Sequence, residues 1–189
     1  MEGEVRILGF AGSLRKASFN KAVLQAVRQL VPTGTVLETF DLDGIPLYNQ
    51  DIEPVLPPKV KEFKAKIRAA DAILIVTPEY NYSIPGVLKN AIDWGSRPYG
   101  DSAWNGKPVA IMGASPGFLG TARAQYQLRQ MFDYLNMYPV NGPEVLISRA
   151  AEKFDEFGNL KDEPTRSLIK ELLNELVRWT QELQKMKKN

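Results

Sequence analysis

A loop of small polar side chains around one arginine follows the first apolar segment of the chain. Residues 8–20 read Leu-Gly-Phe-Ala-Gly-Ser-Leu-Arg-Lys-Ala-Ser-Phe-Asn, and a helical pattern begins directly after them. The loop offers the side chains of Ser13, Arg15, Ser18 and Asn20. With the unpaired backbone N–H groups at the start of a helix, these side chains suit a phosphate. The alternative is that Ser18 or Asn20 only caps the helix, although a cap alone needs neither Ser13 nor Arg15.

Two further loops follow apolar segments in the same way. Residues 77–84 read Thr-Pro-Glu-Tyr-Asn-Tyr-Ser-Ile and combine two flat rings with a stiffening proline and an amide. A flat wall with a few fixed hydrogen-bonding groups suits a planar aromatic cofactor. Residues 114–120 read Ala-Ser-Pro-Gly-Phe-Leu-Gly, and their glycines allow a close backbone approach. The alternative for residues 77–84 is an ordinary turn with two half-buried tyrosines, which is common for one such loop alone. Residues 114–120, taken singly, are equally compatible with a plain strand-to-helix turn.

The chain has no histidine and no cysteine, and these absences exclude several mechanisms. Neither a Ser-His-Asp nor a Cys-His arrangement can form, and neither can a zinc site built on these residues. Carboxylates alone could hold Mg²⁺, but no tight acidic cluster stands out, so we predict no metal site. We name no catalytic side chain and expect any chemistry to come from a bound cofactor.

Composition places the chain among ordinary globular proteins. Its 189 residues, 44% of them hydrophobic, predict one domain over residues 1–189 with a proper core. The net charge of +2 is too small to indicate a nucleic-acid partner. No apolar run approaches the roughly 18 residues that span a bilayer, and Met1–Arg6 does not resemble a signal peptide. We therefore expect no membrane partner and a cytoplasmic location.

Apolar segments of strand length alternate with helical patterns along the chain. Strands are expected at Val5–Phe10, Thr35–Phe40, Asp71–Thr77 and Pro108–Ala114, and either Tyr138–Val140 or Glu144–Ile147 supplies the last one. Helices are expected at Asn20–Leu30, Lys59–Ala69, Pro85–Trp94, Thr121–Leu135 and Arg166–Lys185.

This alternation predicts an α/β fold of three layers with a parallel sheet. Right-handed crossovers place the carboxyl ends of all strands at one edge, where ligands bind. The three loops described above therefore meet there. Residues 41–58 form a long irregular stretch whose apolar and aromatic content predicts that it packs on something.

The first two loops resemble those of a known family. Residues 12–20, Gly-Ser-Leu-Arg-Lys-Ala-Ser-Phe-Asn, and residues 77–94, Thr-Pro-Glu-Tyr-Asn-Tyr-Ser-Ile-Pro-Gly-Val-Leu-Lys-Asn-Ala-Ile-Asp-Trp, closely resemble the NAD(P)H-dependent FMN reductases. The branch that looks most similar contains bacterial chromate and quinone reductases and related azoreductases. The resemblance covers nearly the whole chain, up to about residue 150.

The resemblance implies a flavodoxin-like three-layer sandwich with a five-stranded parallel sheet of order 2-1-3-4-5 and non-covalently bound FMN. Carried over by position, the residues that would hold the FMN phosphate are Ser13, Arg15, Ser18 and Asn20. Those that would line the isoalloxazine ring are Pro78, Glu79, Tyr80 and Asn81. From the third loop, Ser115 and Gly117 would flank the flavin.

The implied activity is ping-pong hydride transfer. NADPH or NADH reduces the flavin, and a quinone, a flavin, an azo compound or chromate then takes the electrons. The resemblance also implies a homodimer or homotetramer in which residues 48–51 approach the partner's flavin site. The sequence leaves open the physiological acceptor and the choice between NADPH and NADH, for which Arg97 and Arg123 are candidate 2′-phosphate ligands.

Two other functions compete with this one. A flavodoxin-type electron carrier would bind FMN without nicotinamide turnover, but flavodoxins are usually strongly acidic and this chain has a net charge of +2. A binder of phosphate sugars or nucleotides would use only the loop at residues 11–20. Colour distinguishes this second alternative, because only a flavoprotein is yellow.

Overall fold

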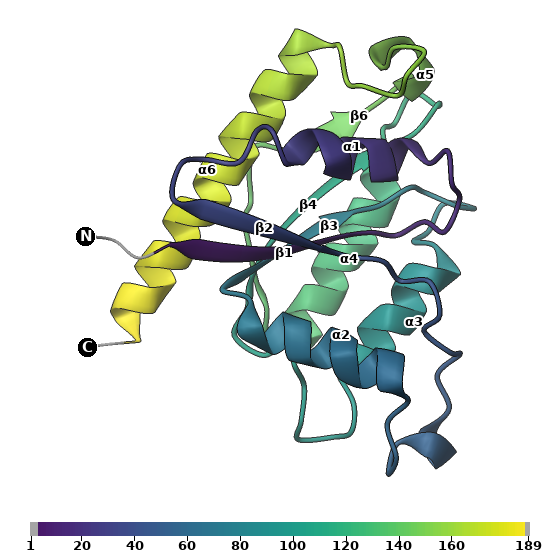
Figure 1. The fold of residues 1–189 in the computed structure, drawn as a ribbon, viewed down its shortest axis with the longest axis vertical. Helices are drawn as coiled ribbons and strands as arrows, with labels where there is room; N and C mark the ends of the chain where they lie inside the picture. Colours follow the sequence, from purple (N-terminus) through teal and green to yellow (C-terminus); the bar gives the residue numbers. More distant parts are fainter. Residues whose placement is uncertain (1–3, 188–189) are drawn as a thin grey trace.

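A parallel sheet lies at the centre of the computed structural model, which describes residues 4–187 (Figure 1). The predicted domain, residues 1–189, therefore extends beyond the described residues at both ends. The strands are β1 (Val5–Ala11), β2 (Thr35–Phe40), β3 (Ala72–Val76), β4 (Pro108–Ala114), β5 (Tyr138–Pro139) and β6 (Val145–Ile147). Their order, β2-β1-β3-β4-β5, confirms the predicted 2-1-3-4-5 topology.

The fifth position of the sheet differs from the prediction of one strand there. Both candidate segments are strands, and both pair in parallel with β4. Strand β5 pairs with the first half of β4, where Pro108 lies opposite Tyr138, and β6 pairs with the second half, where Met112 lies opposite Val145. The backbone leaves the sheet between them, so the sheet has six strands rather than five.

Five helices cover the two faces of the sheet (Figure 1). One face packs against α1 (Phe19–Val27) and α6 (Glu163–Met186), and the other against α2 (Pro58–Ala69), α3 (Gly86–Gly95) and α4 (Ala122–Tyr134). All five residues of β3 are buried, as expected of a parallel strand that is covered on both sides. Each large apolar side chain that the two cores remove from water contributes about 1.5–3 kcal/mol.

Several element boundaries differ from the predicted ones. Helix α1 ends at Val27, three residues early, because the next residues close tight turns such as Leu30 N–H to Val27 O (2.9 Å). Pro85 is the residue before α3 rather than its first residue. A short helix, α5 (Ala150–Lys153), was not predicted, because four residues show no periodicity.

The irregular stretch after β2 packs on α3, as predicted. It contains one 3₁₀ turn, Gln50–Ile52. The Pro46 carbonyl accepts hydrogen bonds from Asn90 Nδ2 (2.9 Å) and Trp94 Nε1 (2.8 Å), and Tyr48 N–H donates to Asn90 Oδ1 (2.7 Å). Asn90 and Trp94 are four residues apart, so one face of α3 holds the stretch in place. No helix within residues 4–187 is both long and apolar enough to cross a membrane.

Candidate functional site

The three loops that follow β1, β3 and β4 are in contact at the carboxyl edge of the sheet, on the right in Figure 1. Gly12 N–H donates to Val76 O (2.8 Å), and Thr77 N–H donates to Met112 O (2.9 Å). The backbone of Gly113 lies so close to Thr121 that a Cβ at this position would be 2.0 Å from Thr121 Oγ1. The sequence therefore brings its three candidate loops together, as the topology predicts.

Within residues 11–20, two serines are used by the loop itself. Ser13 is buried, and its Oγ accepts the N–H of Arg15 (3.3 Å). Ser18 is the N-cap of α1 and accepts Lys21 N–H (3.4 Å). Arg15 is exposed, lies 5.7 Å from the Phe19 ring, and forms no ion pair among the described residues. Its guanidinium is therefore available to an anion.

Asn20 joins the first loop to the third. Its buried amide donates to Ala114 O (2.9 Å) and accepts Ala114 N–H (2.8 Å). This pair of hydrogen bonds reproduces what a neighbouring strand would give β4 at its last residue. Asn20 therefore holds α1 against β4, and both the oxygen and the nitrogen of its side chain bind there.

A tight turn forms the tip of the second loop. Tyr80 and Ser83 exchange two backbone hydrogen bonds of 2.9 Å, and the two residues between them have positive φ, 52° at Asn81 and 65° at Tyr82. Asparagine tolerates this left-handed conformation, but for a tyrosine it costs on the order of 1–2 kcal/mol. The N–H groups of Asn81 and Tyr82 donate no hydrogen bond within residues 4–187.

The carboxylate of Glu79 binds the N-terminus of α4. It accepts the N–H groups of Arg123 (3.0 Å) and Ala124 (3.2 Å), and it forms an ion pair with the Arg123 guanidinium. Thr121, at the N-cap position, provides no side-chain cap of its own. The side-chain hydrogen bond with Glu79 raises the pKa of Arg123. Because the Glu79 carboxylate is occupied, only its backbone remains to line a flavin ring.

Two further contacts join the turn to α4. The Arg123 guanidinium lies 3.5 Å from the centre of the Tyr82 ring. One turn along the helix, Gln127 donates to Tyr82 O (3.1 Å) and accepts the Ser83 hydroxyl (2.6 Å). Sequence reasoning missed these contacts, since residues 41 to 45 positions apart leave no local pattern. Arg123 was considered only as a ligand for a nucleotide phosphate.

The third loop is shaped by its own backbone. Ser115 Oγ accepts Gly117 N–H (3.1 Å), and Gly117 O accepts Arg149 N–H (3.1 Å). Gly120 has a positive φ of 54° and packs against the backbone of β6, where a Cβ would lie 2.5 Å from Leu146 C. Ser115 and Gly117 are thus held by the backbone at the end of β6 and just after it, while their contact with a cofactor stays a prediction.

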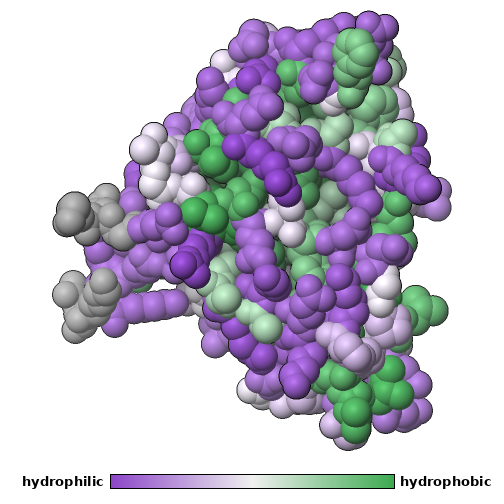
Figure 2. All heavy atoms as spheres, viewed as in Figure 1, coloured by the Kyte–Doolittle hydropathy of each residue, from purple (hydrophilic) through white to green (hydrophobic). Residues whose placement is uncertain are grey.

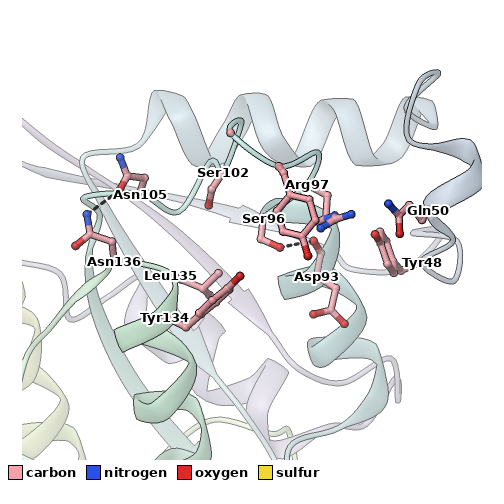
Figure 3. Close-up of a pocket in the computed structure, with 12 residues that line it drawn as sticks. Tyr48, Gln50, Asp93, Ser96, Arg97, Ser102, Asn105, Tyr134, Leu135 and Asn136 are labelled. Atoms are coloured by element: carbon pink, nitrogen blue, oxygen red, sulfur yellow. Dashed lines mark hydrogen bonds between the residues drawn. The ribbon is translucent and has the colours of Figure 1, made fainter.

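A cavity of about 720 Å³ lies away from these three loops (Figure 3). It is bounded by the long stretch after β2 and by the last residues of α3 and α4, including Tyr48, Gln50, Asp93, Ser96, Arg97 and Tyr134. None of the ten predicted cofactor ligands lines it.

Arg97 lies at one wall of this cavity and is almost fully engaged. Its Nε donates to Glu53 Oε1 (2.6 Å), which also accepts the Tyr48 hydroxyl (2.5 Å), and its guanidinium lies 3.6 Å from the centre of the Tyr99 ring. The hydrogen bond from Tyr48, followed by that from Arg97, lowers the pKa of Glu53. The same contact with Glu53 raises the pKa of Tyr48.

A buried lysine fixes the loop that carries Arg97. Lys64 is 1% exposed, and its ammonium donates to the carbonyl of Arg97, to Asp101 O (3.1 Å) and to Asp101 Oδ2 (2.8 Å). The hydrogen bond from Lys64 lowers the pKa of Asp101. Lys64 therefore joins α2 to this wall of the cavity. No group of three or more acidic side chains arranged to hold a metal occurs among residues 4–187.

Comparison with known proteins gives consistent results over nearly the whole chain. The family model of the NADPH-dependent FMN reductases matches residues 5–152. An NAD(P)H-dependent FMN reductase of Pseudomonas aeruginosa is 52% identical over 97% of this chain and 99% of its own. A 2-hydroxy-1,4-benzoquinone reductase of a Burkholderia species is 43% identical over 94% of this chain and 97% of its own.

A solved structure agrees with these relatives. The flavoenzyme NAD(P)H:(acceptor) oxidoreductase FerB of Paracoccus denitrificans superimposes with a TM-score of 0.87 at 35% identity, covering 94% of this chain and 98% of the other. An FMN-dependent NADH-azoreductase of Bacillus anthracis, solved with FMN, shares the fold at a TM-score of 0.58. The family model matches residues 5–152, and the relatives and the solved structure agree with it over nearly the whole chain. The chain therefore belongs to the NADPH-dependent FMN reductase family.

Proposed function

We propose that this protein is an oxidoreductase that passes hydride from NAD(P)H through bound FMN to an acceptor such as a quinone. The observation that carries the proposal is the meeting of an unpaired arginine, an open helix N-terminus and a turn with two unpaired N–H groups at one edge of the sheet. Family membership and the names of the relatives support it.

The loop at residues 11–20 would bind the FMN phosphate. Arg15 supplies the charge, and the N–H groups of Phe19 and Asn20 at the start of α1 have no acceptor within the described residues. The hydroxyls of Ser13 and Ser18 have donor protons to add, because their hydrogen bonds with the N–H groups of Arg15 and Lys21 use them as acceptors. Asn20 would act through its backbone, since its side chain binds Ala114.

The loop at residues 77–84 would contact the flavin ring. Tyr80 is half exposed at the start of the turn and offers a flat face, while Pro78 and the backbone of Glu79 stiffen the approach to it. The unpaired N–H groups of Asn81 and Tyr82 would donate to ring heteroatoms. Ser115 and Gly117 would lie at another side of the flavin.

The chain needs no acid or base of its own for this reaction. Bound FMN supplies the hydride-accepting chemistry, and the protein positions it and adjusts its electronics. The absence of histidine and cysteine is therefore compatible with turnover.

Absorption spectroscopy of the purified protein provides the direct test. We expect flavin bands that disappear when NADPH or NADH is added without oxygen and return when a quinone follows. A colourless protein that does not take up FMN would contradict the proposal and leave a phosphate binder. A yellow protein that neither nucleotide reduces would be an electron carrier.

The ring contact has a separate test. Changing Tyr80 to leucine should alter the fluorescence quenching of bound FMN, because the ring that stacks near the flavin is lost. Unchanged emission would place the isoalloxazine elsewhere. Kinetics with NADPH and NADH across quinones, flavins, azo dyes and chromate would then identify the preferred donor and acceptor.

We also propose that the protein forms a homodimer or homotetramer, with Tyr48-Asn49-Gln50-Asp51 near the partner's flavin. Hydrophobic side chains gather at the lower right of Figure 2, over the stretch after β2, and Leu47 and Val55 there are 84% and 82% exposed. Such patches mark interaction surfaces. Light scattering should report a multiple of the 21.2 kDa chain mass, and a monomer would contradict this. One domain over residues 1–189 and a cytoplasmic location stay predictions.

A further inference from the structure

The turn at Asn81 and Tyr82 depends on α4 for its shape. Both residues have positive φ, and Tyr82 carries a bulky side chain in that conformation. Such a conformation persists only where its surroundings impose it. The surroundings here are the backbone pair of Tyr80 and Ser83 and two side chains one helical turn apart on α4, namely Arg123 and Gln127.

The contacts act on successive parts of the loop. Arg123 pairs with Glu79 before the turn, and its guanidinium lies over the Tyr82 ring within the turn. Gln127 binds the Tyr82 carbonyl and the Ser83 hydroxyl after it. None of these contacts uses the N–H group of Asn81 or Tyr82, and neither group donates a hydrogen bond within residues 4–187.

We propose that Arg123 and Gln127 are positioning residues that hold the Asn81–Tyr82 turn in its left-handed shape, so that its two N–H groups donate to the flavin and favour the reduced ring. The proposal rests on the proposed function and names how this chain adjusts its cofactor. A donor fixed in advance stabilises the negative charge that a ring gains on reduction without a cost of reorganisation. Neither α4 residue needs to touch FMN.

The experiment uses the full chain with bound FMN and measures the dissociation constant of FMN and the midpoint potential of the bound flavin. We expect Arg123→Ala to raise the dissociation constant about tenfold and Gln127→Ala about fivefold. In both variants the midpoint potential should fall, because the turn no longer presents its donors to the reduced ring. Arg123→Lys keeps the charge opposite Glu79 and should give an intermediate potential.

A matched control is Arg178→Ala, which also removes an arginine–glutamate pair, with Glu175 on α6. It should leave the affinity and the potential at the wild-type values. Thermal unfolding of each apoprotein accompanies the titrations. Gln127→Ala is the decisive variant if Arg123→Ala does not fold, because it leaves the Glu79 cap of α4 intact.

The outcomes separate this proposal from the proposed function. If the wild-type protein binds FMN and both variants keep its potential, the α4 residues have only a structural role and the proposal is wrong, even if affinity falls. If the wild-type protein binds no FMN, the proposed function fails and this proposal fails with it.

Discussion

Two arginines lie in opposite surroundings, one in the loop at residues 11–20 and the other beside the cavity at the end of α3. Arg15 is exposed and has no carboxylate partner among residues 4–187. Arg97 is buried, paired with Glu53 and stacked on Tyr99. An anion that reaches Arg15 displaces only water, whereas at Arg97 it must compete with a carboxylate. We therefore expect the FMN phosphate at the loop rather than at the cavity beside Arg97.

We expect the largest effect, on the free energy of unfolding, from loss of the Asn20 contact that holds α1 against β4. Asn20→Leu removes both partners of Ala114 and leaves a buried N–H and a buried carbonyl unsatisfied. We expect the free energy of unfolding of the apoprotein to fall by about 2–4 kcal/mol in urea titrations. The control Gln25→Leu, at an exposed position of α1, should change it by less than about 0.5 kcal/mol. Equal values for the two variants would show that Asn20 does not support the loop.

Arg15→Ala tests the comparison itself. Loss of one charged hydrogen bond to a phosphate, about 1.5–3 kcal/mol, should weaken FMN binding by more than tenfold. Fluorescence titration measures the dissociation constant, with Lys16→Ala as a control that removes a neighbouring positive charge. If Arg97→Ala weakens FMN binding as much as Arg15→Ala does, the two arginines do not differ in the way described.

The smallest effect concerns pH and the Arg97 cavity. The pKa of Glu53 is lowered from its ordinary value of 4.5, first by the Tyr48 hydroxyl and then by Arg97. A lowered pKa in the folded state stabilises the protein above that ordinary value, and the contribution is lost as pH falls through the folded pKa. The difference in unfolding temperature between wild type and Glu53→Gln should therefore be constant near neutral pH and shrink below about pH 4.5.

Glu62→Gln, at an exposed position of α2 whose ion pair with Lys59 spans 3.4 Å, serves as the control for that profile. It should show little change in unfolding temperature at any pH, because exposed pairs contribute little. A Glu53→Gln profile that runs parallel to the wild type down to low pH would show that the carboxylate is not stabilised by its partners.

Much of the fold could be predicted from the sequence because its signals are local. The apolar run of β3 and the polar loops after three strands define a parallel sheet and its functional edge. The split fifth position could not be predicted, since each segment is only two or three residues long. Recognising two strands there requires the register of each segment against β4, which only the structure provides.

The meeting of the three candidate loops at one edge of the sheet was predictable, and the contacts of their individual side chains were less so. A phosphate loop is predicted by the type and spacing of Ser13, Arg15 and Ser18. The hydrogen bonds of Asn20 could not be predicted in this way, because their partner, Ala114, lies 94 positions away. Glu79 shows the same limit, because its carboxylate binds the N–H groups of Arg123 and Ala124 at the start of α4. Contacts of this kind follow from how helices pack on the sheet.

The division of the last sheet position into β5 and β6 has a consequence for local opening. Each short strand pairs with its own half of β4. Val140 still donates its N–H to Val109 O (2.8 Å), and residues 141–144 then leave the ladder. Pairs that share no hydrogen bond can separate one at a time, so the two halves of this edge should exchange their amide hydrogens at different rates. We expect opening near Tyr138 to leave β6 paired beside the third loop, so that motion at the far end of the sheet does not reach the edge where the three loops meet.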